Sequence, residues 1–191
     1  MKIYFESLGC PKARVETEMA MGILALNNHV ITNSIRDADL IFLTTCSFID
    51  DAKKETLKRY KELRKYKKKI IFFGCFVDEE KRKIFDDKNT LFIGTSKLDS
   101  ISELINKNNG IFCGTKNYIH SFPRILSTFP YSYIKVSEGC SNRCSYCIIP
   151  YIRGDYRERN IKEIIDEAKG ILSLGIKEII LISQDLSLIH I

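Results

Sequence analysis

The sequence predicts an α/β protein, in which a parallel-sheet domain is followed by the first βαβ unit of a second domain. The first hundred or so residues alternate short apolar runs with longer segments of helical periodicity, a pattern typical of parallel strands covered by helices. The chain has 191 residues, 45% of them hydrophobic, which lies between one large domain and two small ones. We therefore expect one domain and part of a second.

The first domain is expected to span residues 1–107. The helix predicted after Ile49 carries an apolar stripe with lysines on its remaining surface, as expected of a helix packed on a sheet. Further helices are predicted from about Arg14 and over 98–106. The predicted strands are residues 2–5, 40–44, 70–73 and 91–93. Together these elements predict a flavodoxin-like fold.

Residues 108–131 are predicted to form a linker, because periodicity fades there and Gly and Pro interrupt the segment. A strand is then expected at 132–136, a helix from Asn160 with Glu163 in a capping box, and a strand at 178–183. The last strand is apolar on both faces, which suits a strand covered on both sides. Two strands cannot supply that cover, so we expect residues 132–191 to be a truncated part of a larger barrel.

Charge and hydropathy restrict location and partners. No segment is long and apolar enough to cross a bilayer and no signal peptide is evident, so we expect a cytoplasmic protein without membrane contact. The net charge is +6, and residues 53–69 hold ten Lys or Arg against two Glu. Such a lysine-rich face attracts phosphate. We favour the alternative of a solvated helix face, because no aromatic side chains interleave for base stacking.

Three of the seven cysteines form a CxxxCxxC array, at Cys140, Cys144 and Cys147. The array follows a predicted strand, so three thiolates can converge from one loop. A structural zinc site needs four ligands, and no fourth Cys or His lies at finger spacing. A 4Fe-4S cluster held by three cysteines keeps one iron open. The array therefore predicts a reactive cluster, with a zinc or electron-transfer site as the alternative.

Cys10, Cys46 and Cys75 each follow a predicted strand. Loops that leave the carboxyl ends of neighbouring parallel strands meet at one edge of the sheet. Three thiolates at that edge predict a second cluster with an open iron, although each cysteine taken singly is more often a small buried hydrophobe. Cys113 lacks this context and is interpreted as a plain thiol.

The segment GCSNRCSYC, with Tyr146 before the third cysteine, resembles the radical S-adenosylmethionine (SAM) superfamily signature. The resemblance implies that SAM binds the open iron and is cleaved to a 5′-deoxyadenosyl radical. It also implies that the backbone around Tyr146 lies beside the adenine, although plain packing of Tyr146 is equally compatible with the sequence. Arg153, in PYIRG, is expected to contact the SAM carboxylate or the substrate, with a simple turn and a surface arginine as the alternative.

The segments SLGCPKARVETE, TTCSFIDDAKKET, FFGC and SEGCSNRCSYCIIPYIRG together resemble the radical SAM methylthiotransferases over nearly the whole chain. One branch of that family modifies an aspartate of the twelfth small-subunit ribosomal protein, and another modifies an adenosine of transfer RNA. LGCPK and CSFIDDAK resemble the first branch. The family often has Asn where Ala13 stands, and Asp-Ser where Glu16 and Thr17 stand.

The family resemblance implies two 4Fe-4S clusters with different roles. The cluster at Cys10, Cys46 and Cys75 would carry a sulfur that one SAM methylates, and the other cluster would cleave a second SAM. Implied partners are the ribosomal protein, ribosomal RNA at residues 53–69 and an electron-donor protein. A family member continues beyond Gln184 through further barrel strands, so we expect this chain to hold clusters but to turn over poorly. A non-catalytic iron-sulfur or zinc module is the alternative of another class.

Overall fold

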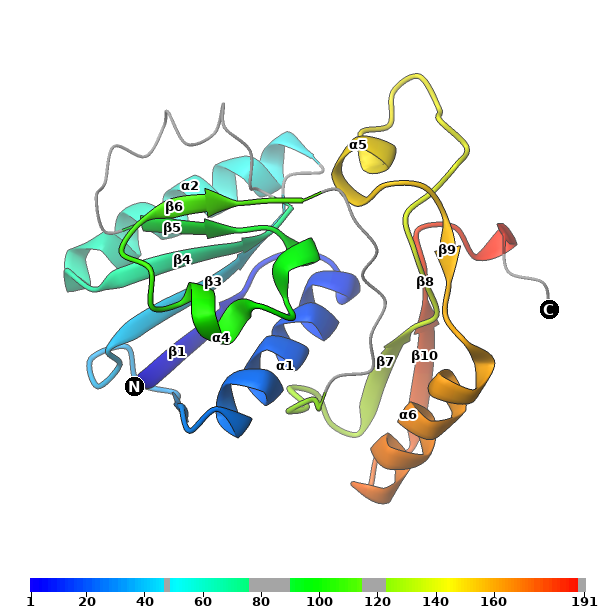
Figure 1. Cartoon of the computed structure of the whole chain (residues 1–191), viewed down its shortest axis with the longest axis horizontal. Coiled ribbons are helices and arrows are strands. Elements are labelled where there is room, and N and C mark those ends of the chain that lie inside the picture. Colours follow the sequence, from blue (N-terminus) through cyan, green and yellow to red (C-terminus); the bar gives the residue numbers. More distant parts are fainter. Residues whose placement is uncertain (47–48, 76–89, 115–122, 189–191) are drawn as a thin grey trace.

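The computed structural model describes residues 1–46, 49–75, 90–114 and 123–188. Within these ranges the first part of the chain forms a six-stranded sheet in the order β2-β1-β3-β4-β5-β6, and every pairing is parallel (Figure 1). This arrangement confirms the predicted α/β class. The strands are β1 (Lys2–Ser7), β2 (Val30–Thr32), β3 (Leu40–Thr45), β4 (Lys69–Gly74), β5 (Thr90–Ile93) and β6 (Gly110–Phe112).

Helices cover both faces of this sheet. Helices α1 (Pro11–Leu26) and α4 (Ile101–Leu104) pack on one face, and α2 (Asp50–Leu63) packs on the other. Every residue of β3 is buried, and its side chains alternate between the two cores. Leu40 and Phe42 join the α1 core, whereas Ile41 and Leu43 join the α2 core. The continuous apolar run of β3 therefore has its cause in burial on both faces.

The sheet extends further than the sequence predicted. Strand β6 lies inside the expected linker at 108–131 and pairs with β5, so the sheet continues past residue 107. Strand β2, which pairs with β1, was also not predicted. Both strands have only three residues and are not fully buried, so neither carries a clear apolar pattern. The helix expected over 98–106 is a single turn, α4, preceded by a 3-10 turn at Thr95–Lys97.

The second part of the chain begins with a βαβ unit, as predicted. In the described residues, β7 (Tyr131–Lys135) and β10 (Glu178–Ile182) pair in parallel, and α6 (Ile161–Ser173) connects them. The Asn160 side chain accepts a 2.8 Å hydrogen bond from the Lys162 backbone N–H, which confirms Asn160 as the N-cap residue, although this bond goes to the second helical residue and not to Glu163 as in a capping box. The remaining elements are β8 (Ser137–Glu138), α5 (Ile149–Arg153), β9 (Arg157–Glu158) and a 3-10 turn at Leu186–Leu188.

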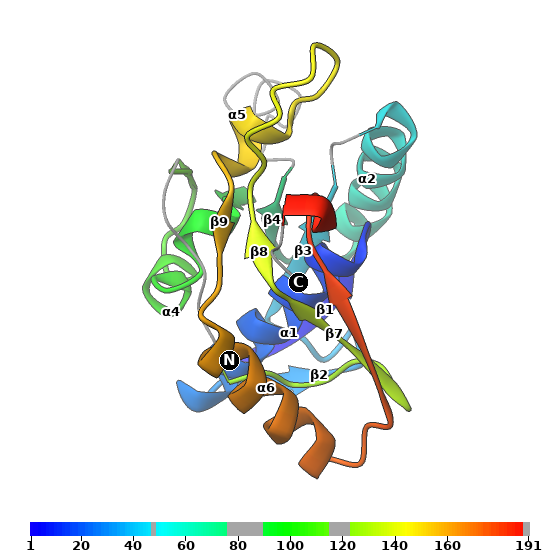
Figure 2. The same ribbon diagram turned by 90° about the vertical axis from the view of Figure 1, so that its right-hand side faces the viewer.

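Helix α1 lies between the two parts of the chain. Figure 1 shows it with the sheet on one side and the β7-β10 pair on the other. Tyr133 of β7 and Ile182 of β10 pack against the same core as α1. Figure 2, turned by 90°, shows β7, β8 and β10 in front of α1. In the part of the chain that the structure describes, no helix is long and apolar enough to cross a membrane.

Candidate functional site

Cys10, Cys46 and Cys75 lie at the carboxyl ends of β1, β3 and β4, which are neighbours in the sheet. Cys10 is the N-cap residue of α1, and the backbone N–H of Cys75 donates to the carbonyl oxygen of Thr45 at 3.3 Å. The loops that carry the three cysteines therefore leave the same edge of the sheet. This is the placement that the strand-then-cysteine pattern predicted.

Glycines allow two of these loops to approach closely. Gly9 and Gly74 precede Cys10 and Cys75 and have φ angles of +110° and +112°. A Cβ added at Gly9 would lie 2.7 Å from the Cβ of Cys46, and one added at Gly74 would lie 2.7 Å from the Thr45 oxygen. The Gly-Cys pair at both positions is a sequence signal that the strand pattern alone did not use.

The second cysteine set lies on the loop between β8 and α5, which is closed at its base. The Cys140 backbone N–H donates to the Gly154 oxygen at 3.1 Å, and the Cys147 N–H donates to the Cys144 oxygen at 2.9 Å. Asn142, between the first two cysteines, donates to Asp185 at 2.6 Å. The cysteines of this set therefore sit on one short loop that contacts the end of α5 and the residues after β10.

Both sets have the donor chemistry of an iron-sulfur cluster. Each set consists of three free cysteines, of which Cys10 and Cys144 are exposed and the other four are partly buried. Among the described residues, no three Cys, His, Asp or Glu side chains are gathered closely enough to hold one metal ion. The thiolates that bind an iron-sulfur cluster lie further apart than the ligands of a single metal ion, because each binds a different iron. The two sets therefore fit such a cluster in the type and number of their ligands.

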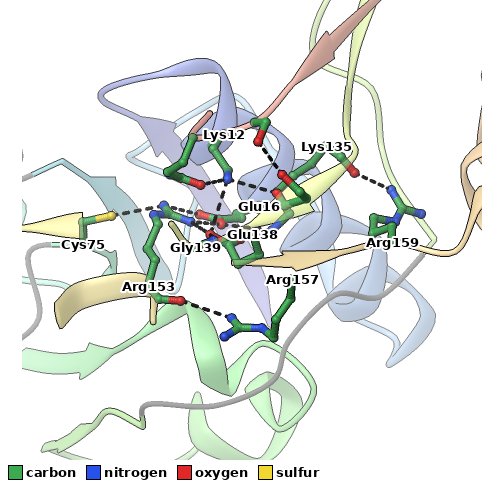
Figure 3. Close-up of polar contacts among 12 residues, drawn as sticks. Lys12, Glu16, Cys75, Lys135, Glu138, Gly139, Arg153, Arg157 and Arg159 are labelled. Atoms are coloured by element: carbon green, nitrogen blue, oxygen red, sulfur yellow. Dashed lines mark hydrogen bonds and ion pairs between the residues drawn. The ribbon is translucent and has the colours of Figure 1, made fainter. Parts of the chain in front are cut away.

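Arg153, which follows the second set, is buried rather than exposed in a turn. Its side chain is 2% exposed and donates from Nη1 to Glu16 at 2.6 Å and to Glu138 at 3.1 Å. Nη2 donates to the other oxygen of Glu16 at 3.2 Å and to the Sγ of Cys75 at 3.1 Å (Figure 3). The surface-arginine alternative is therefore wrong. The structure gives this guanidinium two carboxylates and a thiol as partners, and its contact with the SAM carboxylate or the substrate stays a prediction.

Two lysines complete the buried cluster around Arg153. Lys135 Nζ donates to Glu138 at 2.7 Å and to Glu16 at 3.3 Å, and Lys12 Nζ lies 3.4 Å from Glu138. We call Lys12, Glu16, Lys135, Glu138 and Arg153 the charge cluster. It joins α1 to β7, β8 and α5, so it lies at the contact between the two parts of the chain.

Burial and pairing perturb the titration of the charge cluster. Burial by itself raises the pKa of Glu16, but Arg153 and Lys135 outweigh that effect and hold the pKa below its ordinary value. The pKa of Lys12 is lowered to about 8, chiefly by burial, although Glu138 opposes the shift. Burial also raises the pKa of the Cys75 thiol, with Arg153 acting in the opposite direction. Burial likewise raises the pKa of Glu138, but Lys135 and Arg153 outweigh it and hold that pKa well below its ordinary value, so both carboxylates are ionised at neutral pH.

Tyr146 and the lysine-rich segment lie at the surface. Tyr146 is 89% exposed, which rules out plain packing as its role in this structure. In the lysine-rich segment, Lys68 donates to the carbonyl oxygens of Arg36 and Ala38, and Lys69 donates to that of Ile105 at 2.6 Å. Part of this segment is therefore engaged within the chain, and the choice between a solvated face and ribosomal RNA contact stays a prediction.

A cavity of about 520 Å³ lies between the sheet edge and α5. Cys75 lines it from the sheet side, and Tyr151 of α5 and Ile148, the N-cap residue of α5, line it from the other side. Cys113 also lines this cavity, so the one cysteine that the sequence left without context lies close to the site. The edge of the sheet and the helix that follows the second cysteine set thus enclose a common space.

Two family models match the chain, one in each part. Residues 2–94 match the uncharacterized protein family UPF0004, and residues 134–189 match the radical SAM superfamily. The first match covers the sheet through β5 and contains Cys10, Cys46 and Cys75. The second begins in β7 and contains Cys140, Cys144 and Cys147.

Curated relatives match almost the whole chain. The chain is 41% identical to ribosomal protein uS12 methylthiotransferase RimO of Syntrophomonas wolfei, over 98% of this chain and 46% of that protein. The chain is 37% identical to the RimO of Acetivibrio thermocellus, over 97% of this chain and 46% of that protein. It is 35% identical to the RimO of Pelotomaculum thermopropionicum, over 97% of this chain and 45% of that protein. The chain thus spans about half the length of these relatives. The chain thus contains a UPF0004 segment and a radical SAM segment, and over almost its whole length it is similar to proteins named ribosomal protein uS12 methylthiotransferase RimO.

Proposed function

We propose that this chain is part of an enzyme that adds a methylthio group to the β-carbon of an aspartate in ribosomal protein uS12. The observation that carries the proposal is a cavity that joins the two parts of the chain, lined by Cys75 of the first cysteine set and by the helix that follows the second set. Cys75 lines the cavity from the sheet edge, and α5, which begins two residues after Cys147, lines it from the other side. The names of the relatives support uS12 as the substrate over the alternative, transfer RNA.

In this proposal each cysteine set holds one 4Fe-4S cluster. Cys140, Cys144 and Cys147 would hold the cluster that binds SAM, and Cys10, Cys46 and Cys75 would hold the auxiliary cluster. When bound, these groups supply radical hydrogen abstraction and the methylthio sulfur. A C–H bond beside an ionised carboxylate has no useful acidity, so an ordinary general base is poorly suited to the reaction at neutral pH.

The protein side chains would position the reacting groups. Tyr146 is exposed on the loop of the second set, where its backbone is available to lie beside the SAM adenine. Ile148 and Tyr151 line one side of the cavity and would present apolar surface there to a bound substrate. We further propose a cytoplasmic location, an electron-donor protein as partner, and ribosomal RNA contact by those lysines of 53–69 that remain exposed.

Metal analysis after anaerobic reconstitution tests this proposal. We expect iron and sulfide for two clusters, with one cluster lost in Cys10→Ala and the other in Cys144→Ala. Bound zinc without iron would contradict the proposal and favour a non-catalytic metal module. Mass spectrometry of uS12 and of transfer RNA from a strain that lacks the gene separates the two substrates, because only the true substrate loses its methylthio group.

A further inference from the structure

Arg153 connects the two cysteine sets, because it follows Cys147 by six residues and contacts Cys75. We propose that Arg153 is a positioning residue for the auxiliary cluster, whose guanidinium donates a hydrogen bond to the Cys75 sulfur while that sulfur ligates iron. Glu16 and Glu138 would hold the guanidinium in place. This inference rests on the proposed function, since it requires Cys75 to be a cluster ligand.

The orientation of the guanidinium is defined by several contacts. Glu16 accepts from both Nη1 and Nη2, a forked pairing that suits the planar guanidinium, and Glu138 accepts from Nη1 as well. Glu16 is fully buried and the Glu138 side chain is 6% exposed, so water competes little for these bonds. The contact from Nη2 to Cys75 is therefore directed by the protein rather than by chance side-chain rotation.

The backbone that carries Arg153 is held as well. Arg153 is the last residue of α5, and its carbonyl oxygen accepts a 3.1 Å hydrogen bond from Arg157 (Figure 3). The carbonyl oxygen of the next residue, Gly154, accepts from the N–H of Cys140. The Cys75 sulfur thus contacts Arg153, and the base of the loop that carries the second cysteine set contacts the adjacent residue, Gly154.

The net positive charge of the charge cluster also favours negative charge on the Cys75 sulfur. Lys12, Lys135 and Arg153 bring three positive charges against the two negative charges of Glu16 and Glu138. Hydrogen bonds and positive charge beside a ligating sulfur stabilise the reduced state of an iron-sulfur cluster and raise its potential. Loss of Arg153 is therefore expected to make the auxiliary cluster harder to reduce.

The test uses chains that also carry Cys144→Ala, so that only the auxiliary cluster is present. Iron content and an anaerobic redox titration followed by electron paramagnetic resonance are measured for Arg153→Met and Arg153→Lys. We expect Arg153→Met to lower the ratio of reduced to oxidised cluster at a fixed poise by roughly tenfold, which for a one-electron couple is a shift of about 59 mV. Arg153→Lys keeps the positive charge but not the planar two-nitrogen geometry of the guanidinium. Its shift in potential should therefore be smaller and of the same sign.

Arg143→Met is the matched control, since Arg143 is 71% exposed and pairs with Asp155 at the surface. An Arg153→Met chain that holds full iron and keeps the same potential as the control would overturn the inference and leave the proposed function intact. Absence of auxiliary iron with Arg153 unchanged would instead defeat the proposed function. If the circular dichroism of Arg153→Met shows that it does not fold, Arg153→Lys provides the test. An unchanged potential of the auxiliary cluster in Arg153→Lys would then overturn the inference.

Discussion

Replacement of Arg124 by Met should destabilise the contact between the two parts of the chain. The Arg124 guanidinium lies between Glu18 of α1 and Glu167 of α6, and donates to the Tyr133 carbonyl oxygen at 2.9 Å. The three charged side chains are 4%, 2% and 7% exposed. Loss of the arginine would leave two carboxylates buried with one fewer cation between them.

The expected cost follows from this burial. Breaking a buried ion pair by removal of one partner costs about 3–5 kcal/mol. Glu18 keeps its bonds from the N–H and hydroxyl of Ser127, and Glu167 keeps Arg159, which places the cost toward the lower end. For a chain of this size, 1 kcal/mol corresponds to about 2–4 °C in Tm. Arg124→Met should therefore lower the Tm by roughly 6–12 °C at the lower end of that range.

Thermal unfolding of the cluster-free chain at pH 7, followed by circular dichroism, measures this effect. Lys54→Met is the control, because Lys54 pairs with Asp51 at the surface and its side chain is 77% exposed. The control should leave the Tm unchanged. Adding Glu18→Gln to Arg124→Met should restore part of the loss, since it removes one unpaired charge. A Tm for Arg124→Met within about 2 °C of the control would refute the reasoning.

Three further predictions concern the cysteine edge and the charge cluster. Gly74→Ala should lower both the Tm and the auxiliary iron content, because the new Cβ would lie 2.7 Å from the Thr45 oxygen at a φ of +112°; unchanged iron and Tm would contradict this. The pKa of Glu16 is lowered in the folded chain, so its stabilising contribution is present above the ordinary pKa of 4.5 and is lost as the pH falls through the lower folded value. Between pH 7 and pH 3, the free energy of unfolding in urea should accordingly fall less steeply for Glu16→Gln than for the unaltered chain. Cys113→Ala should retain the iron of both clusters, unlike Cys10→Ala, and loss of one cluster in Cys113→Ala would assign that thiol a ligand role.

The sheet and the placement of the cysteines were predictable because both are local properties of the sequence. A buried strand such as β3 is a continuous apolar run, and the residue after such a run necessarily lies at the strand end. Strand β6 was missed because it is the outermost strand, and its three partly buried residues produce no such run. Its place depends on pairing with β5 and not on its own pattern.

The environment of Arg153 could not be predicted in the same way. Its carboxylate partner Glu16 lies 137 residues earlier in the chain, and no periodicity connects the two positions. Glu16 lies on a helix, where an acidic residue ordinarily predicts a solvent face, yet it is fully buried. Only the packing of α5 against the sheet edge brings these groups together, and that packing is a property of the tertiary structure.

The position of α1 has a consequence for how the chain unfolds. Eleven of its 16 residues are buried, including Lys12, Glu16 and Glu18, whose ion-pair partners lie in the second part of the chain or, for Glu18, in the segment just before β7. Separation of the two parts would expose the face of this helix that packs on β7 and β10, and would leave its ionised side chains without their partners. The two matched segments are therefore expected to unfold in one cooperative transition, and a protease that cuts between them should release no independently stable fragment.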